Sequence, residues 1–151
     1  MHSGGTIRFH FPNKGVTLRE RSRLKDFIAA MLKKHRRKID SISYVFCSDE
    51  YLLEINRKYL QHNWYTDIIT FELSEQGQEI VADIYVSVDR VRDNARVLGV
   101  PLILELHRVI FHGVLHLCGY EDKSLKGKQL MRVKEDYYLN RYFVPRENPK
   151  S

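Results

Sequence analysis

The sequence has few cysteines, few prolines and no long apolar run. Its 151 residues include only two cysteines, Cys47 and Cys118, too few for a disulfide framework or for a zinc site built from cysteine alone. Both are expected to be small buried apolar side chains. No stretch approaches the ~18 apolar residues of a membrane span, and residues 1–6 contain no apolar segment typical of a secretory signal. These absences predict a soluble, cytoplasmic protein with no membrane partner.

The length and composition are those of one globular domain. Hydrophobic residues make up 43% of the chain and charged residues 29%. A chain of this size buries roughly 70% of the surface that its unfolded form exposes, which is enough for a core without disulfides. We therefore predict a single domain over residues 1–151, with a polar tail at residues 145–151 that frays.

Positive charge is concentrated near the N-terminus. Residues 14–38 contain ten basic and two acidic side chains, whereas residues 39–118 contain six basic and twelve acidic ones. Clustered Lys and Arg favour a polyanionic partner such as RNA, because they release condensed counterions when they contact phosphates. We take Arg36, Arg37 and Lys38 as candidate RNA contacts. The alternative is an exposed helix face that is merely solvated.

Four segments have the composition of strands. Apolar residues alternate with polar ones over residues 7–11, and residues 42–47 are β-branched and aromatic. Two further apolar runs, at residues 66–73 and 79–88, are separated by the polar turn 74–78 and predict a hairpin.

Apolar residues at helical spacing predict five helices. The first begins at a capping box formed by Thr17 and Glu20. Pro101 fits the first turn of the fourth. The other expected boundaries are Ser48 to about Tyr59, Ser87 to Leu98, Pro101 to Cys118, and about Ser124 to Tyr142. The order of elements predicts an α+β fold, with a small mixed sheet of about four strands packed by about five helices.

The helix expected to end at Cys118 is apolar around most of its circumference, as a central buried helix would be. At ~100° per residue, its polar exceptions Glu105, Arg108, His112 and His116 fall within an arc of about 80°. His112 and His116 are four residues apart, which lets two imidazoles on one helical face bind one metal ion. The sequence therefore places metal ligands on the central helix.

A third ligand is expected just after this helix. Gly119 can reverse the chain and return a residue three positions later to the two imidazoles. Asp122 is the predicted ligand, with Glu121 as its rival. Two histidines and one carboxylate with an open fourth position are typical of a catalytic zinc site. We predict one Zn²⁺ per chain, although histidine and carboxylate also suit manganese or nickel.

The residue after the first histidine narrows the chemistry. H-E-x-x-H peptidases use a Glu there as general base, whereas this chain has Gly113. Peptide hydrolysis of that kind is therefore disfavoured. A metal that polarises a phosphate and generates hydroxide near neutral pH suits phosphodiester hydrolysis instead, so we expect a metallohydrolase-like domain.

The histidine segment and three others together resemble a known family. Residues 112–122 read HGVLHLCGYED, and INRKY at 55–59, TDIITF at 66–71 and ADIYVS at 82–87 occur in matching order. This pattern is similar to the YbeY family of bacterial metal-dependent endoribonucleases over roughly residues 40–140. The resemblance implies a single-strand-specific endoribonuclease that acts in small-subunit rRNA 3′ end maturation and ribosome quality control. Its implied partners are an rRNA precursor, the ribosome and ribosomal proteins.

The chain departs from the family pattern at the third ligand. The family segment carries three histidines as zinc ligands, of which His112 and His116 match. Asp122 stands in the place of the third histidine, and Glu121 in the place of an aspartate. Because Asp is itself a competent ligand, we expect the site to survive with altered affinity and metal preference.

Leu60 stands where the family usually has an arginine. If that arginine helps bind or cleave RNA, another side chain must replace it. This departure keeps open the alternative of a non-catalytic rRNA-binding or ribosome-binding factor with a structural or vestigial metal. The candidate replacements are Arg57, Lys58, His62 and Arg108, of which Arg57 and Lys58 are also candidate RNA contacts.

Three further side chains are catalytic candidates. Asp67 heads an apolar strand and could orient a ligand histidine or act as a base, or simply cap a turn. Arg108 lies one turn before His112 and could contact a substrate phosphate, or pair with Glu105. Glu121, beside the third ligand, completes the set.

Overall fold

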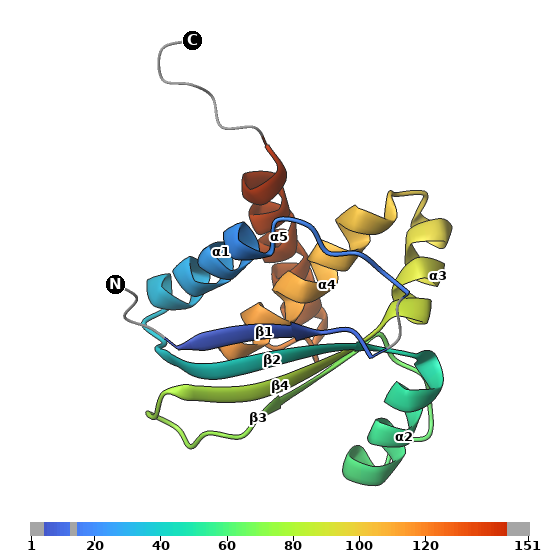
Figure 1. Ribbon diagram of the computed structural model, residues 1–151, viewed down its shortest axis with the longest axis horizontal. Helices are drawn as coiled ribbons and strands as arrows, with labels where there is room; N and C mark the ends of the chain where they lie inside the picture. Colours follow the sequence, from blue (N-terminus) through green and yellow to red (C-terminus); the bar gives the residue numbers. More distant parts are fainter. Residues whose placement is uncertain (1–4, 13–14, 145–151) are drawn as a thin grey trace.

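The computed structural model describes residues 5–12 and 15–144, and within them four strands form one mixed sheet (Figure 1). Its order is β1-β2-β4-β3, in which β3 pairs antiparallel with β4 and the other neighbours are parallel. The predicted α+β class and hairpin are thus confirmed, with both hairpin strands slightly shorter than expected. The strands are β1 (Thr6–His10), β2 (Ile39–Cys47), β3 (Ile68–Glu72) and β4 (Ile80–Ser87).

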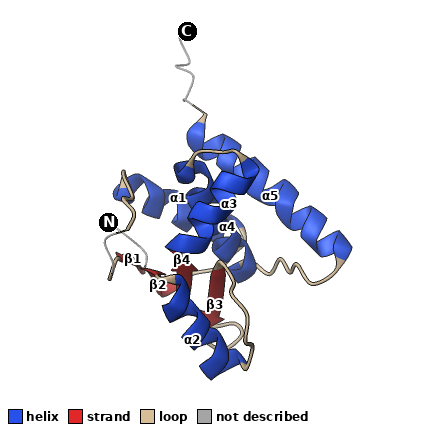
Figure 2. Cartoon of the chain, turned by 90° about the vertical axis from the view of Figure 1, so that its right-hand side faces the viewer, coloured by secondary structure: helices blue, strands red, loops and turns tan. Residues whose placement is uncertain are grey.

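The described part of the chain also contains the five expected helices (Figure 2). By length and hydropathy, none of these helices could cross a membrane singly, although α3 and α4 pass that test as a pair bent by 120°. The tail predicted to fray at residues 145–151 lies outside the described residues. The helices are α1 (Arg21–Lys34), α2 (Asp49–Leu60), α3 (Val88–Leu98), α4 (Leu102–Leu117) and α5 (Leu125–Phe143).

Most of the predicted helix ends are confirmed, but two details are wrong. The capping box at Thr17 fails because Glu20 adopts a left-handed backbone (φ 53°, ψ 47°), so α1 begins only at Arg21. Pro101 precedes the first residue of α4 instead of lying in its first turn. Serine side chains cap three helices by accepting a backbone N–H three residues on, as is usual at an N-cap. These serines are Ser48, Ser87 and Ser124.

The two faces of the sheet are covered by different helices. Residues of β4 alternate, so that Ile84 and Val86 are buried in the main core with α1, α4 and α5. Figure 1 shows these three helices on one side of the sheet. On the other side, Tyr85 and Ile69 pack with α2 in a smaller cluster. Strand β3 is therefore an edge strand with α4 on one face and α2 on the other.

Gly113 allows α4 to lie close to β3 and β4. A Cβ built there would lie 3.1 Å from Cδ1 of Ile68 and 3.3 Å from two carbons of Ile84, a tight contact that either isoleucine would have to relieve. Tyr44 holds the same stretch of helix by donating its buried hydroxyl to the carbonyl of Ile110, at 3.0 Å. The neighbouring His112 is consequently held near the edge strand.

The two cysteines differ in burial. Cys47 is buried as predicted, whereas Cys118 is only partly buried, because it lies at the end of α4 where the chain turns outward. Desolvation raises the pKa of each thiol to about 12. Both side chains are therefore protonated at neutral pH, and neither is an activated nucleophile.

Candidate metal centre

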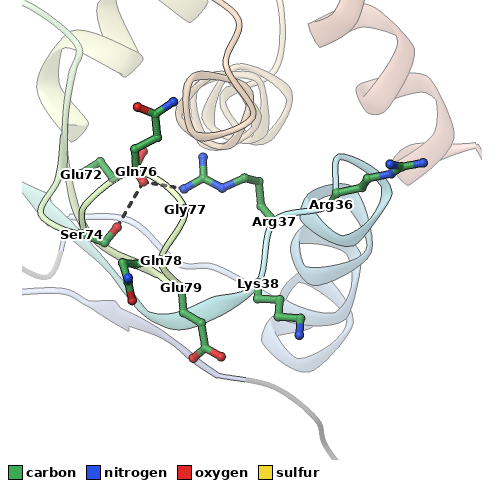
Figure 3. Close-up of a pocket in the computed structure, with 9 residues that line it drawn as sticks. All are labelled: Arg36, Arg37, Lys38, Glu72, Ser74, Gln76, Gly77, Gln78 and Glu79. Atoms are coloured by element: carbon green, nitrogen blue, oxygen red, sulfur yellow. Dashed lines mark hydrogen bonds and ion pairs between the residues drawn. The ribbon is translucent and has the colours of Figure 1, made fainter.

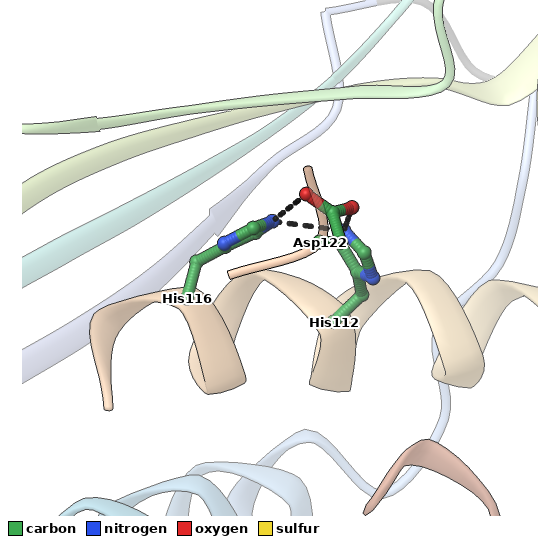
Figure 4. A group of neighbouring side chains, drawn as sticks. All are labelled: His112, His116 and Asp122. Atoms are coloured by element: carbon green, nitrogen blue, oxygen red, sulfur yellow. Dashed lines mark hydrogen bonds and ion pairs between the residues drawn. The ribbon is translucent and has the colours of Figure 1, made fainter. Parts of the chain in front are cut away.

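The three predicted ligands are brought together in the structure. Nε2 of His112 and Nε2 of His116, on successive turns of α4, are 3.0 Å apart. The carboxylate of Asp122 approaches both, with one oxygen 3.4 Å from Nε2 of His112 and the other 3.7 Å from Nε2 of His116. Figure 4 shows the three side chains pointing toward one another. A cluster with this donor set can hold a metal ion.

The loop after α4 selects Asp122 as the third ligand. Gly119 takes a positive φ of 105°, which turns the chain back toward the helix. The loop then lies against the first turn of α5, where a Cβ on Gly127 would be only 2.6 Å from the carbonyl oxygen of Glu121. In this loop the side chain of Glu121 is exposed and outside the cluster, while Asp122 is partly buried within it.

The outer nitrogens of both rings are hydrogen-bonded to oxygen. Nδ1 of His116 lies 2.9 Å from the carbonyl oxygen of Tyr120, and Nδ1 of His112 lies 2.6 Å from Oε2 of Glu135. A carbonyl can only accept, so Nδ1 of His116 donates, and the carboxylate of Glu135 accepts in the same way from His112. In their neutral forms the two Nε2 atoms therefore both present lone pairs to the same point. A metal ion bound between them would satisfy both lone pairs together with the carboxylate of Asp122.

The two histidines have different affinities for a proton. Burial disfavours the charged form of His112, but the hydrogen bond and negative charge of Glu135 outweigh it and raise the pKa of this ring. Burial and the neighbouring His112 lower the pKa of His116 below its ordinary value. At neutral pH, His116 is therefore the neutral imidazole that a metal requires.

Glu135 is the functional residue that sequence reasoning missed. It lies on α5, is only 6% exposed, and accepts from Arg108 through Oε1 at 3.0 Å as well as from His112 through Oε2. One signal in the sequence could have identified it. Glu135 lies at helical spacing among the apolar and aromatic residues that form the buried face of α5. A carboxylate in such a row is costly to bury unless it is paired. The other buried residues of this face are Met131, Tyr138, Leu139 and Tyr142.

Arg108 is paired more extensively than predicted. Its predicted partner Glu105 is 3.7 Å away, but the shorter contacts reach α5, at 3.0 Å to Glu135 and 2.7 Å to Asp136. The guanidinium is thereby held beside the carboxylate that binds His112. This places Arg108 next to the metal centre, with its nitrogens already engaged.

A cleft of about 400 Å³ opens in front of the three ligands, between β3 and the end of α4. Asp67 lies in this cleft, where burial raises the pKa of its carboxyl and nearby His112 opposes that rise. The orienting role considered for Asp67 is filled by Glu135 and Tyr120, which leaves the roles of a base and of a turn cap. Besides the ligands, the cleft is lined by Thr66, Asp67, Ile68, Thr70, Glu72 and Leu117.

Comparison with known proteins agrees with this geometry. A family model described as Endoribonuclease YbeY matches residues 11–143. The chain belongs to this family. It is 47% identical over 135 residues to the Endoribonuclease YbeY of Cytophaga hutchinsonii, covering 89% of this chain and 94% of that protein. The Endoribonuclease YbeY of Flavobacterium psychrophilum is 46% identical over 127 residues, which are 84% of this chain and 90% of that protein.

A solved structure supports the same assignment. The solution structure of TM1509 from Thermotoga maritima is similar to this chain, with a TM-score of 0.62 and 28% identity. The match covers 89% of this chain and 87% of that one. The resemblance inferred from the histidine segment is therefore confirmed at the level of family and fold.

The basic candidates Arg36, Arg37 and Lys38 lie at the far end of β3 from Asp67. They line a cavity of about 720 Å³ together with Glu72 and the β3–β4 turn (Figure 3). Arg37 donates to the carbonyl of Leu117 at 2.6 Å and to Glu72 at 2.5 Å, so it fastens the end of α4 to β3. Arg36 and Lys38 point away from Arg37 in Figure 3, and both are exposed.

The remaining candidates lie on α2, on the opposite side of β3 from α4. Arg57 and Lys58 are exposed in the last turn, where Arg57 donates to the side chain of Asn63. Leu60, the position of the family arginine, is 39% exposed at the end of the helix. The structure does not bring this end of α2 into the lining of the metal cleft.

We expect Glu135→Gln to weaken zinc binding about 10- to 100-fold, because a carboxylate that accepts from a ligand histidine fixes its tautomer and strengthens it as a donor. Competition with a chromogenic chelator measures this affinity. Glu54→Gln, an exposed change on α2, is the matched control. Equal affinities in the two variants would show that Glu135 does not act on the metal centre.

Proposed function

We propose that the protein is a metal-dependent endoribonuclease that hydrolyses single-stranded RNA at the centre formed by His112, His116 and Asp122. The observation that carries the proposal is the convergence of two imidazole lone pairs and one carboxylate on a single point at the base of an open cleft. The relatives are named Endoribonuclease YbeY, and that name supplies the substrate class.

Zinc suits this donor set, at one ion per chain. For Zn–N bonds of about 2.0 Å, two ligands of a tetrahedron lie about 3.3 Å apart, and the two Nε2 atoms are 3.0 Å apart. Manganese and nickel accept the same ligand atoms. We propose zinc because two histidines and one carboxylate with an open fourth position are typical of a catalytic zinc site. A divalent ion held there supplies Lewis acidity for phosphodiester hydrolysis.

The surrounding side chains have separate proposed roles. Asp67 lines the cleft together with the ligands and is proposed as the general base for an attacking water. Burial raises the pKa of its carboxyl, and a pKa nearer to neutral suits a general base better than the ordinary value of a carboxyl. Arg108 acts by holding Glu135, since its shortest contacts are already made with carboxylates. Glu121 is exposed on the loop that carries Asp122 and is not one of the clustered ligands. Any contact it makes with substrate would therefore be at the surface of the protein.

The RNA partner is proposed to be an rRNA precursor. Arg36 and Lys38 line the cavity at one end of β3, which shares Glu72 with the metal cleft, and Arg57 and Lys58 add exposed positive charge on α2. In this proposal the protein acts in the cytoplasm in small-subunit rRNA 3′ end maturation and ribosome quality control, with the ribosome and ribosomal proteins as partners. The second candidate, a non-catalytic rRNA-binding factor, is favoured by Leu60 in the place of the family arginine.

We expect His116→Ala to abolish RNA cleavage while leaving RNA affinity within about twofold, because the change removes a metal ligand and not a phosphate contact. Gel analysis of a labelled rRNA fragment measures cleavage, and fluorescence anisotropy measures binding. His10→Ala, at an exposed position on β1, should cleave as the unmodified protein does. An unmodified, metal-loaded protein that binds rRNA without cutting it would favour the non-catalytic factor.

Reversing Arg36 and Lys38 to Glu should weaken RNA binding and flatten its dependence on salt. Each phosphate of a single strand that the protein neutralises contributes about 0.7 to the slope of log affinity against log salt. Loss of two such contacts, one for each substituted residue, should reduce the magnitude of the slope by about 1.4. Arg37 is left unchanged because it holds α4 to β3. A control that reverses exposed Arg96 and Arg141 makes the same change in net charge. Equal slopes in both double variants would remove Arg36 and Lys38 from the interface.

A further inference from the structure

The loop that links α2 to β3, whose path is drawn in Figure 2, carries large aromatic side chains that are exposed. Trp64 is 58% exposed and Tyr65 is 48% exposed, and Tyr59 at the end of α2 is 58% exposed. Isolated apolar side chains on a surface need no explanation, whereas several exposed aromatic rings on one short segment are a candidate binding surface. The metal centre and its cleft do not use these rings.

Two of the rings in this loop form an ordered stack. The imidazole of His62 lies parallel to the indole of Trp64, with centroids 4.2 Å apart and planes 17° apart. Since His62 covers part of one face of the indole, the large remaining exposure of Trp64 belongs to the rest of the ring. The pair therefore presents a flat aromatic surface to solvent.

Hydrogen bonds fix this loop to the last turn of α2. The buried amide of Asn56 donates to the carbonyl of Trp64 at 2.8 Å, and the carbonyl of Asn56 accepts from the backbone N–H of His62 at 3.1 Å. Arg57 also donates to the side chain of Asn63. The rings are thus held before any ligand arrives, which reduces the entropy lost on binding.

The chain leads from the stack directly into the lining of the metal cleft. Thr66 and Asp67, two and three residues after Trp64, both line that cleft. An extended chain covers at most about 3.6 Å per residue, so the Cα atoms of Trp64 and Asp67 are at most about 11 Å apart. At the other end of β3, Glu72 lines both the metal cleft and the cavity of Arg36 and Lys38.

The charges around the rings favour nucleic acid over protein as the occupant. Arg57 and Lys58 are exposed beside them, with the Lys58 ammonium 5.4 Å from the ring of Tyr59. Arg90 lies 5.2 Å from the ring of Tyr65, although its charge is already paired with Asp49. Aromatic rings interleaved with cations are typical of surfaces that bind single strands, where bases stack and phosphates meet Lys or Arg.

We propose that His62 and Trp64 form a stacking platform for bases of single-stranded RNA next to the nucleotides bound in the metal cleft. The proposal rests on the endoribonuclease function and adds to it the site that selects single strands. A base can lie on the platform only when it is unstacked and unpaired, so a duplex cannot use it. The substrate then runs along β3, from the platform past the metal centre to Arg36 and Lys38.

Trp64 is the only tryptophan in the chain, so its fluorescence reports on the platform alone. The probe is a single-stranded uridine octamer, and its control is an abasic octamer with the same number of phosphates. Both are titrated into the full chain carrying His116→Ala, which prevents cleavage. The uridine octamer should quench Trp64 at saturation, and the abasic octamer should bind with little quenching.

Trp64→Leu tests the energetic contribution of the ring in the same background. Anisotropy of labelled octamers should show about a tenfold loss of affinity for the uridine octamer, with the affinity for the abasic octamer unchanged. A general structural defect would weaken both. Tyr137→Ala, which removes another exposed aromatic ring on α5, should change neither.

The outcomes separate the platform from the function on which it rests. Binding of the uridine octamer without a change in Trp64 fluorescence would overturn the platform alone and would leave the aromatic surface to a protein partner. Equal affinity of Trp64→Leu and its parent for the uridine octamer would overturn it as well. Failure of both octamers and of an rRNA fragment to bind would overturn the proposed function together with the platform.

Discussion

Nδ1 of His112 donates to Glu135 and Nδ1 of His116 donates to the carbonyl of Tyr120, and these two hydrogen bonds turn both Nε2 atoms to one point. Without them, either ring could place a hydrogen on Nε2 and the pair would satisfy itself. With them, two lone pairs and the Asp122 carboxylate face each other at the base of a cleft. Such an arrangement suits a divalent ion, and the chemistry of the cleft would depend on which ion binds there.

Several contacts elsewhere in the fold hold the three ligands in position. The contact of Gly113 with Ile68 and Ile84 sets the distance between α4 and the edge strand, and the contact of Gly127 with Glu121 sets the position of the ligand loop on α5. Arg108 holds Glu135 in place from the same helix as the histidines. The cleft is bounded on its far side by β3, an edge strand whose two ends lead to the aromatic loop and to the basic cavity.

The parts of the site that sequence predicted are the local ones. His112 and His116 are one helical turn apart and Gly119 allows the return to Asp122, so helix geometry and one turn are enough to bring the three together. Glu135 and Arg37 depend on packing between distant elements, and no local period reveals that Arg37 reaches Leu117 or that Glu135 reaches His112. The predicted capping box is wrong for a related reason. Glu20 adopts a left-handed backbone conformation, which the spacing of Thr17 and Glu20 in the sequence does not predict.

The central claim is that the chain itself holds one divalent ion on two histidines and one aspartate. Elemental analysis of the protein purified without added metal, beside its Asp122→Ala variant, tests that claim most directly. We expect about one zinc per unmodified chain, and little or none in the variant, because a site with two protein ligands loses most of its affinity. An unmodified protein that contains no metal and takes up no zinc when it is supplied would contradict the claim.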